Sequence, residues 1–461
     1  MGIGSAMARS LSALSLGLLL TAAEPARADP EQVAVLNPNG ATFFSHPDTW
    51  WWASGQVNLI TQAHPGFESP YSGPNSLSAG AQARTSYVAT LFLGARVTHT
   101  TELLFDVESA GGRGIGDALG LGGFTDLDVV RNPSLGPAPY IARAMVRQII
   151  PLSSEEVDEH RDNLHLAGKV PMRRLEVRAG KFGTADFFDT NSYGSDSHLQ
   201  FMNWTVDNDG SYDYAADTRG YTLGAILDYE EPRFGVLFGA MLMPKIANGP
   251  DYDFDIRHSH AENLEIDVRE SIAERAGVVR LIGYVNHADM GSYREAISAY
   301  QLGVDPVPDI TAHREQGAIK YGASVNLEQT LQGPLAAFAR AGWNDGRTES
   351  FAYTEVDDTL ELGLHLDGAV YGRALDSSGL AFVTNGLSAD HREYLALGGS
   401  GFILGDGRLN YARETIAEGY YTASLNHGVY AAIDGQFVGN PGFNHDRGPV
   451  WVGSLRFHLE L

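Results

Sequence analysis

The chain has 461 residues, with 32 Lys and Arg against 57 Asp and Glu, and a formal net charge of −25. It is 43% hydrophobic and 19% charged, which excludes wholesale disorder. The absence of cysteine excludes disulfide scaffolds, Cys-ligated zinc, iron–sulfur clusters and thiol nucleophiles. The acidic excess argues against nucleic acid as a partner, because few basic groups could neutralise its phosphates. Length alone would favour roughly two or three soluble domains.

The first 28 residues have the organisation of an export signal. Arg9 provides a positively charged start, and residues 11–23 form an apolar segment too short to span a bilayer. Small residues at Ala26 and Ala28 provide a cleavage site, which we place after Ala28. We therefore expect residues 1–28 to be a signal peptide and residues 29–49 to be an N-terminal periplasmic segment.

Past this leader, no stretch of the sequence predicts a transmembrane helix. The most apolar run, residues 234–243, has about half of the ~20 residues that such a helix needs. Two environments remain for the exported protein. It is either free in the periplasm or medium, or inserted in the outer membrane of a Gram-negative bacterium as a β-barrel.

The dominant pattern along the chain has a period of two residues, which is typical of β-strands. Apolar side chains alternate with charged or small ones in residues 103–107, 175–179, 319–328 and 360–367. Each run places an apolar row on one face of a strand and a polar row on the other. Runs of about ten residues recur from Trp52 to the C-terminus, as expected for transmembrane strands.

Three features favour a barrel over a soluble β-sandwich. The polar rows carry many charges of both signs, as a water-filled lumen requires, and aromatic residues gather near strand ends. The last strand alternates to the final residue, with Trp451, Phe457 and Leu461 on its outward face. A final strand of this kind closes many outer-membrane barrels and is recognised by their assembly machinery, although most end in Phe. Because no composition break divides the chain, we predict a single barrel domain over residues 50–461.

Several short motifs follow one another in order along the mature chain. They are ELLFDVE at 102–108, GKFG at 180–183, DFFDTN at 186–191, QFMNW at 200–204, WNDGR at 343–347 and HREYL at 391–395. In this order they resemble the carbohydrate-selective porin (OprB-like) family of Gram-negative outer membranes. The resemblance covers most of the chain, from about Trp50 to Leu461.

The resemblance implies an all-β transmembrane antiparallel β-barrel of about sixteen strands, with inward-folded loops that constrict the lumen. Residues 203–221 and 376–406 are the segments expected to fold partly inward and narrow the lumen. It also implies a porin that admits monosaccharides and other small carbohydrates into the periplasm by passive diffusion. No cofactor is expected, and the other partners would be outer-membrane lipid and the assembly machinery.

Charged and aromatic residues on the expected inward face are candidates for the sugar pathway. A sugar offers hydroxyls for hydrogen bonds and an apolar ring face for aromatic contacts, and its binding must stay weak or it would not leave. The alternative for each charged residue is structural, because it can pair with a neighbour and stiffen the wall. The candidates are Arg84, Glu102, Asp106, Arg143, Arg147, Glu176, Arg178, Trp204, Tyr212 and Tyr214.

An acidic segment supplies weak candidates for a metal site. Four of its residues match ligand positions of a calcium loop of about twelve residues, but Ile256 stands where such a loop needs Gly. These four are Asp251, Asp253, Asp255 and Glu262. His258 and His260 lack a third ligand nearby in the sequence. We therefore expect no metal, with a calcium-stabilised outer loop as the alternative.

No grouping of residues indicates an enzyme. Asp186 and Asp189 come nearest to a glycosidase pair, but their spacing in the sequence does not give their separation in space. The serine-hydrolase motif G-x-S-x-G is absent. Two alternatives to a sugar porin remain: a secreted all-β carbohydrate-binding or glycoside-hydrolase domain, and a porin of different selectivity.

Overall fold

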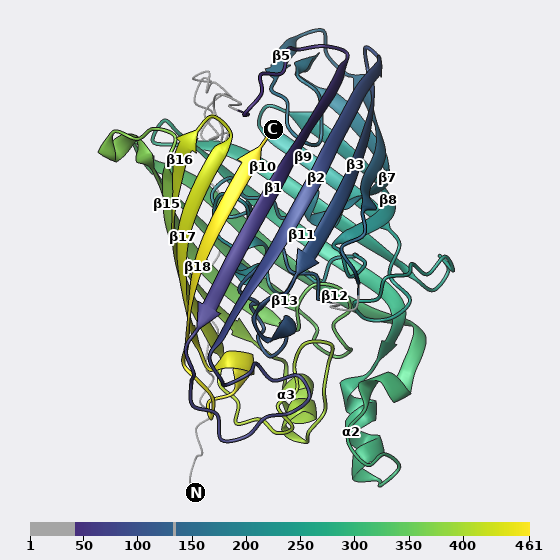
Figure 1. Cartoon of the computed structure of the whole chain (residues 1–461). Coiled ribbons are helices and arrows are strands. Elements are labelled where there is room, and N and C mark those ends of the chain that lie inside the picture. The colour runs from purple at the N-terminus through teal and green to yellow at the C-terminus, as the bar shows by residue number, and fades with distance from the viewer. Residues whose placement is uncertain (1–41, 132–134) are drawn as a thin grey trace, which may run out of the picture.

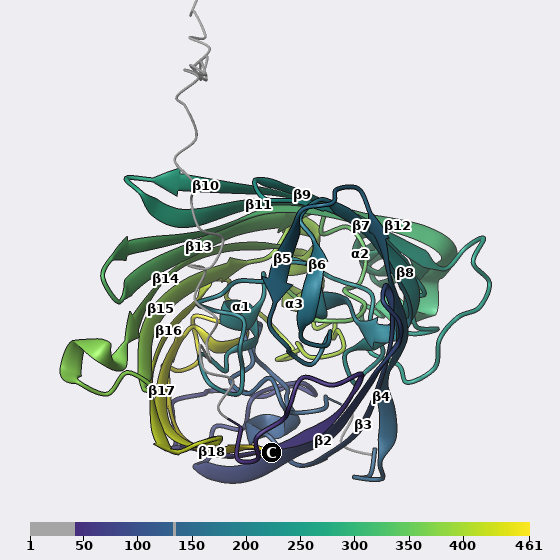
Figure 2. The ribbon, with the colours of Figure 1, turned by 90° about the horizontal axis from the view of Figure 1, so that it is seen from above.

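The computed structural model describes residues 42–131 and 135–461. The signal peptide expected at residues 1–28, and most of the segment expected at 29–49, lie outside the described residues. The described chain forms one closed β-barrel with loops folded into its interior (Figure 1, Figure 2). No helix in the described ranges is long and apolar enough to cross a membrane.

The first eight strands of the wall are β1 (Trp51–His64), β2 (Gln82–Thr98), β3 (Thr101–Gly112), β4 (Tyr140–Pro151), β7 (Arg174–Gly183), β8 (Tyr221–Glu231), β9 (Phe234–Met241) and β10 (His260–Ile272). The other wall strands are β11 (Arg275–Gly291), β12 (Arg314–Gln332), β13 (Leu335–Asn344), β14 (Asp358–Asp367), β15 (Ser377–Gly386), β16 (Glu414–Asn426), β17 (Val429–Gly439) and β18 (Val450–Glu460). The α-helices are α1 (Trp204–Asp207), α2 (Tyr293–Gln301) and α3 (Ala389–Ala396).

The order of strands around the barrel follows the chain, and all neighbours are antiparallel. β4 pairs with β7 because β5 (Glu156–Glu159) and β6 (Gly168–Pro171) form a separate two-stranded sheet. β1 and β18 close the barrel, with Leu59 opposite Phe457. This closed barrel of sixteen strands confirms the architecture predicted from the sequence.

The outward row of the wall is apolar, as the period-two pattern predicts. On β14, Leu360 and Leu362 are 49% and 57% exposed, whereas Glu361 between them is fully buried. On β18, Leu455 is 64% exposed and its neighbour Arg456 is buried. A bilayer would cover such an apolar outer band, while the polar row faces the interior.

The two ends of the barrel differ in the length of their connections. At one end, which we call the turn end, β2–β3, β8–β9, β10–β11, β12–β13 and β16–β17 are joined by two-residue turns. At the other, the loop end, longer segments such as residues 184–220 and 387–413 connect the strands. The C-terminus lies at the turn end, at the top of Figure 1, where the Phe43 amide donates to the Glu460 carbonyl oxygen at 2.8 Å.

Three segments from the loop end fold into the barrel and form much of its core. Residues 114–129, 184–220 and 345–357 contact one another there, and residues 199–218 are buried throughout. The amide of Trp204 donates to the Phe124 carbonyl oxygen at 2.8 Å, and the amide of Phe351 donates to Asp213 at 2.9 Å. Residues 203–221 therefore do fold inward, as the family resemblance implies.

Residues 376–406, expected to fold partly inward, are divided: the carbonyl oxygen of Ile403 accepts from the amide of Gly120 in an inward segment at 2.8 Å, but the expectation was wrong for the first part of the range. Residues 377–386 form the wall strand β15, because Leu380 and Phe382 alternate with buried residues and face outward. α3 lies at the loop end beyond the wall strands, packed against α2 (Figure 1). Tyr293 and Tyr394 meet there with ring centroids 5.1 Å apart, within a second apolar cluster.

Candidate functional site

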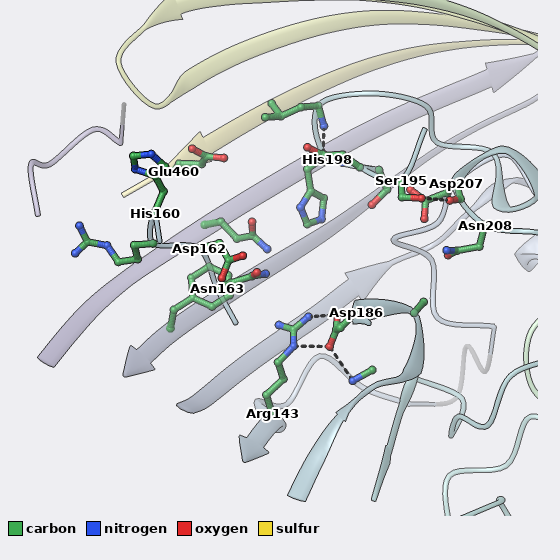
Figure 3. Close-up of a pocket in the computed structure, with 18 of the residues that line it drawn as sticks. Arg143, His160, Asp162, Asn163, Asp186, Ser195, His198, Asp207, Asn208 and Glu460 are labelled. Atoms are coloured by element: carbon green, nitrogen blue, oxygen red, sulfur yellow. Dashed lines mark hydrogen bonds and ion pairs between the residues drawn. The ribbon is translucent and has the colours of Figure 1, made fainter. Parts of the chain in front are cut away.

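A cavity of about 3580 Å³ lies inside the barrel. Its lining comes from the wall, from the inward loop of residues 184–220, from residues 352–353 and from the β5–β6 hairpin. Seen down the barrel axis, β5, β6 and α1 lie within the ring of the wall (Figure 2). Arg143, Asp186, His198 and Asp207 surround a common space (Figure 3).

Three aromatic side chains, which we call the aromatic row, lie next to one another on the cavity surface. Trp204 stacks on Tyr353 with ring centroids 5.6 Å apart and planes 7° from parallel. Tyr214 follows, 4.7 Å from Tyr353. Each ring combines a large apolar face with a polar group at its edge. The aromatic row can therefore contact the apolar face of a sugar ring.

Local structure fixes the position of Trp204. The ring lies at the start of α1, which Asn203 caps by accepting a hydrogen bond from the amide of Thr205 at 3.0 Å. The indole Nε1 donates to the carbonyl oxygen of Asp126 at 2.8 Å. A ring held in this way loses little conformational freedom when a solute contacts it.

Arg340 on β13 anchors the inward loop to the wall. Its buried guanidinium lies 3.1 Å from Asp189 and 3.0 Å from Glu361. It also donates to the carbonyl oxygens of Val206 at 2.8 Å and Asp207 at 3.1 Å. Carbonyls at the end of a helix lack partners within it. One arginine therefore stabilises both the end of α1 and two buried carboxylates.

Arg143 and Asp186 place an ion pair on the cavity surface (Figure 3). Nη2 of Arg143 lies 2.5 Å from Oδ1 of Asp186, and Nη1 lies 3.0 Å from Oδ2 of Asp106. Asp106, a predicted pathway residue, lies behind this pair and does not line the cavity. Charged groups of both signs at fixed positions can exchange hydrogen bonds with the hydroxyls of a solute.

Four other predicted residues form a chain of ion pairs on the inner face of the barrel wall. Arg147 is fully buried, 2.7 Å from Glu176 and 3.2 Å from Glu102, and Glu176 lies 2.5 Å from Arg178. Their side chains point inward as the alternation predicts, yet none of the four lines the cavity. The reason is that partners cover them, since Arg147 also binds Glu159 of the β5–β6 hairpin at 2.7 Å.

Tyr212 and Arg84 also lie away from the cavity. Tyr212 is buried, and its hydroxyl donates to Asn263 on β10 at 2.7 Å. Its ring supports Tyr214 from the side, with centroids 5.5 Å apart. Arg84 lies near the loop end of β2 and donates to the carbonyl oxygen of Ala83 at 3.0 Å. The predicted residues that line the cavity are Arg143, Trp204 and Tyr214.

An ion pair between two inward loops lies beside the aromatic row. Nε2 of His198 lies 3.2 Å from Oδ1 of Asp128. Burial lowers the pKa of His198, but the Asp128 carboxylate outweighs that effect, and the pKa rises to about 9. Burial raises the pKa of Asp128, but His198 more than offsets it, so the net pKa lies below its usual range. The pair is therefore charged at neutral pH.

The β5–β6 hairpin lines the cavity at the turn end. Both carboxylate oxygens of Glu159 accept from Arg147 of the wall, at 2.8 and 2.7 Å. Arg161, just past β5, lies 3.3 Å from Asp48 in the segment that precedes β1. The hairpin is thus held to the wall on one side and to the N-terminal segment on the other.

Several cavity residues were missed by sequence reasoning. Tyr353 lies in a segment that lacks the period-two alternation of a strand. That lack is the only sign in the sequence that the segment is a loop inside the barrel. His198 and Asp128 gave no signal, because they come from different loops. The carboxyls considered as a glycosidase pair are each bound by an arginine, Asp186 by Arg143 and Asp189 by Arg340.

The four carboxylates of the expected calcium loop are not brought together. Asp255 lies 2.8 Å from Arg257 and 3.3 Å from His258, while Asp253 accepts from the Asp255 amide. Glu262 lies on β10, 3.3 Å from His260. Among the described residues, the potential metal ligands that lie close together are His260, Glu262 and His287. Asp251, Asp253 and Asp255 are not part of this cluster.

A family of known proteins matches this chain. Residues 75–461 match the family described as Carbohydrate-selective porin, OprB family. The high-pH structure of Pseudomonas putida OprB has a TM-score of 0.68 and 15% identity, over 89% of this chain and 94% of that chain. The outer membrane channel DcaP of Acinetobacter baumannii has a TM-score of 0.48 and 12% identity, over 91% and 100%. No curated protein sequence matches the chain.

The family match extends over most of the chain and includes fifteen of the sixteen wall strands in full, all but β1. The apolar outer band, the closed wall and the polar cavity are the features that such a channel needs. The chain therefore belongs to the OprB family of carbohydrate-selective porins, and it is an outer-membrane sugar porin, a channel rather than an enzyme.

Proposed function

We propose that monosaccharides cross the barrel by passive diffusion along the aromatic row, with Arg143 and Asp186 as hydrogen-bonding partners. The observation that carries the proposal is that the stacked Trp204 and Tyr353 share one cavity with this ion pair. An aromatic face suits the apolar side of a sugar ring, and charged groups suit its hydroxyls. Neither kind of contact is strong in water, so the solute can leave as readily as it enters.

The turn end would face the periplasm and the loop end the cell exterior, because barrels of this class have short periplasmic turns and long outer loops. In this orientation the β5–β6 hairpin stands at the periplasmic exit, and the inward loops narrow the path before it. We further propose that residues 1–28 direct export and are removed. The strand β18, with its outward row from Trp451 to Leu461, would be recognised by the assembly machinery.

Swelling of liposomes that contain the purified protein tests the selectivity. Glucose should enter several-fold faster than an amino acid or an organic acid of similar size, because it can use both the aromatic row and the ion pair. Uptake that depends on solute size alone would contradict the proposal. Faster uptake of the organic acid would instead indicate a porin of different selectivity.

A further inference from the structure

Three metal-ligating side chains meet on the outer face of the barrel, away from the sugar pathway. His260 and Glu262 lie two residues apart on β10, and His287 lies opposite His260 on β11. One potential ligand atom from each residue lies within 4.8 Å of the others. The two imidazole rings are 4.4 Å apart and nearly parallel, and Nε2 of His260 lies 3.3 Å from Oε1 of Glu262.

This cluster interrupts a row that is otherwise apolar. On the same face, Leu264 is 43% exposed and Ile319, which pairs with His287 from β12, is 52% exposed. Polar and ionisable groups are costly against hydrocarbon. Two imidazoles and a carboxylate on this face therefore need a polar surrounding or a bound ion.

Aromatic residues show at what level of the membrane the cluster lies. Tyr321 on β12 pairs with Val285, and Val285 pairs with Glu262, so the three lie side by side across adjacent strands. Tyr321 packs against Trp343 with ring centroids 5.9 Å apart, and both are exposed on the outer face. Tyr and Trp prefer the headgroup zone. His260 and His287 lie one step further toward the loop end, where water and ions have access.

The hydrogen bonding of the cluster is incomplete. Nδ1 of His260 is buried and has no hydrogen-bond partner within the described ranges. The two rings stack on each other, and His260 contacts Glu262 through Nε2 alone. Two imidazole nitrogens and one carboxylate are a donor set that zinc favours, with about 2.0–2.2 Å to each ligand atom. Small rotations of these three side chains would bring their ligand atoms around one ion.

We propose that His260, Glu262 and His287 bind one divalent cation of the zinc class on the outer wall of the porin. Three protein ligands leave a fourth position open toward the outside, which water can occupy. Calcium fits this set poorly, because it takes about six to eight oxygen ligands. Since the ligands come from both β10 and β11, the ion would tie the loop-end parts of these strands together.

Zinc analysis of the mature porin, purified in detergent without a histidine tag, tests the proposal. After incubation with zinc chloride and dialysis, the unaltered protein should retain one zinc ion per chain. His260→Ala and His287→Ala should retain none, and Glu262→Gln should bind more weakly by about tenfold or more, since one ligand of three is lost. His99→Ala, at the exposed turn between β2 and β3, is the matched control and should retain the full amount.

Cobalt provides a second readout that does not depend on transport. Cobalt bound by the unaltered protein should give the intense visible absorption of a four-coordinate site, and zinc should displace it. Each variant is first checked for the heat-dependent shift in electrophoretic mobility that a folded barrel shows. Failure of the unaltered protein to retain zinc would overturn the proposal. Equal zinc retention by the folded His260→Ala/His287→Ala double variant would overturn it as well.

Discussion

Arg178 on β7 lies between two carboxylates, 2.5 Å from Glu176 and 2.9 Å from Asp228. Its guanidinium also lies over the ring of Phe187, 5.0 Å from the centroid. The side chain is 8% exposed and does not line the cavity. These contacts assign Arg178 to the wall, although its inward position made it a candidate for the sugar pathway.

We therefore expect Arg178→Ala to destabilise the barrel more than it alters transport. Removing the guanidinium leaves the buried carboxylate of Asp228 without its cation, whereas Glu176 keeps Arg147 and Arg174. Breaking a buried ion pair in this way costs about 3–5 kcal/mol. Unfolding in urea should show this loss, whereas the glucose dependence of the current stays near that of the unaltered protein. Arg84→Ala, which breaks no ion pair within the described residues, should change stability by about 0.5 kcal/mol or less. If the Arg178→Ala protein has normal stability but its current no longer depends on glucose, Arg178 belongs to the sugar pathway.

At the residue scale, the sequence predicted which side chains point inward but not which of them reach the cavity. Arg147 and Arg143 lie four residues apart on β4 and share the inward face. Arg147 is covered because the β5–β6 hairpin supplies Glu159, whereas Arg143 stays at the cavity surface. That difference depends on which loop reaches each residue, and no local pattern records such a contact.

Side chains of the wall hold the β5–β6 hairpin: Arg147 binds both carboxylate oxygens of Glu159, and Arg96 on β2 donates to the carbonyl oxygens of Leu166 and Ala167 at 3.3 and 3.0 Å. Glu159→Gln should loosen the β5 side of the hairpin while the wall remains closed, because Arg147 keeps Glu102 and Glu176 as partners. Limited proteolysis in detergent should then cut residues 156–171 several-fold faster. Glu156→Gln, on the same strand and exposed, is the matched control. Unchanged cleavage of the Glu159 variant would mean that other contacts hold the hairpin.

The His198–Asp128 pair makes the contact between two inward loops dependent on pH. The pKa of His198 in the folded protein, about 9, lies above the usual value near 6.5. While Asp128 is ionised, the pair contributes its full stabilisation below about pH 6.5 and loses it as the pH rises through about 9. We expect the current through single channels to become noisier between pH 8 and 10, since the loops are then less restrained.

Two substitutions check this assignment. His198→Gln should give noise at neutral pH similar to that of the unaltered protein at pH 10, with little further change on titration. His160→Gln removes an exposed histidine from the same cavity and should leave the pH dependence intact. If the pH dependence persists in His198→Gln but is lost in His160→Gln, the titrating group is His160 of the hairpin and not His198.

At the scale of elements, the strands could be predicted and the placement of loops could not. The outward row Leu360, Leu362 and Leu364 predicts β14 because alternation is a local property of the sequence. Residues 345–357 fold inward because Asp213 accepts from the amides of Phe351 and Ala352, and these contacts join distant parts of the chain. Residues 377–386 alternate like any wall strand, which should have argued against placing them inside the lumen.

At the scale of the whole molecule, the closed ring of strands explains the length and the apolar content of the chain. The length suggested two or three soluble domains, yet one barrel uses the described chain from Trp51 to Glu460. The apolar residues form the outer band, and many interior charges are paired, as Arg340 is with Asp189 and Glu361. The pairing of β1 with β18 leaves the barrel no free strand edge.

The central claim is that sugars interact with the aromatic row as they cross the barrel, and current through single channels in planar bilayers tests it most directly. Added glucose should reduce the current and reach saturation. Trp204→Ala should raise the glucose concentration for half-maximal reduction by about 2- to 10-fold, since aromatic contacts are worth about 0.5–1.5 kcal/mol. Trp451→Ala, on the outer face, should leave it unchanged. A reduction that never saturates, or one that is identical in Trp204→Ala, would contradict the account.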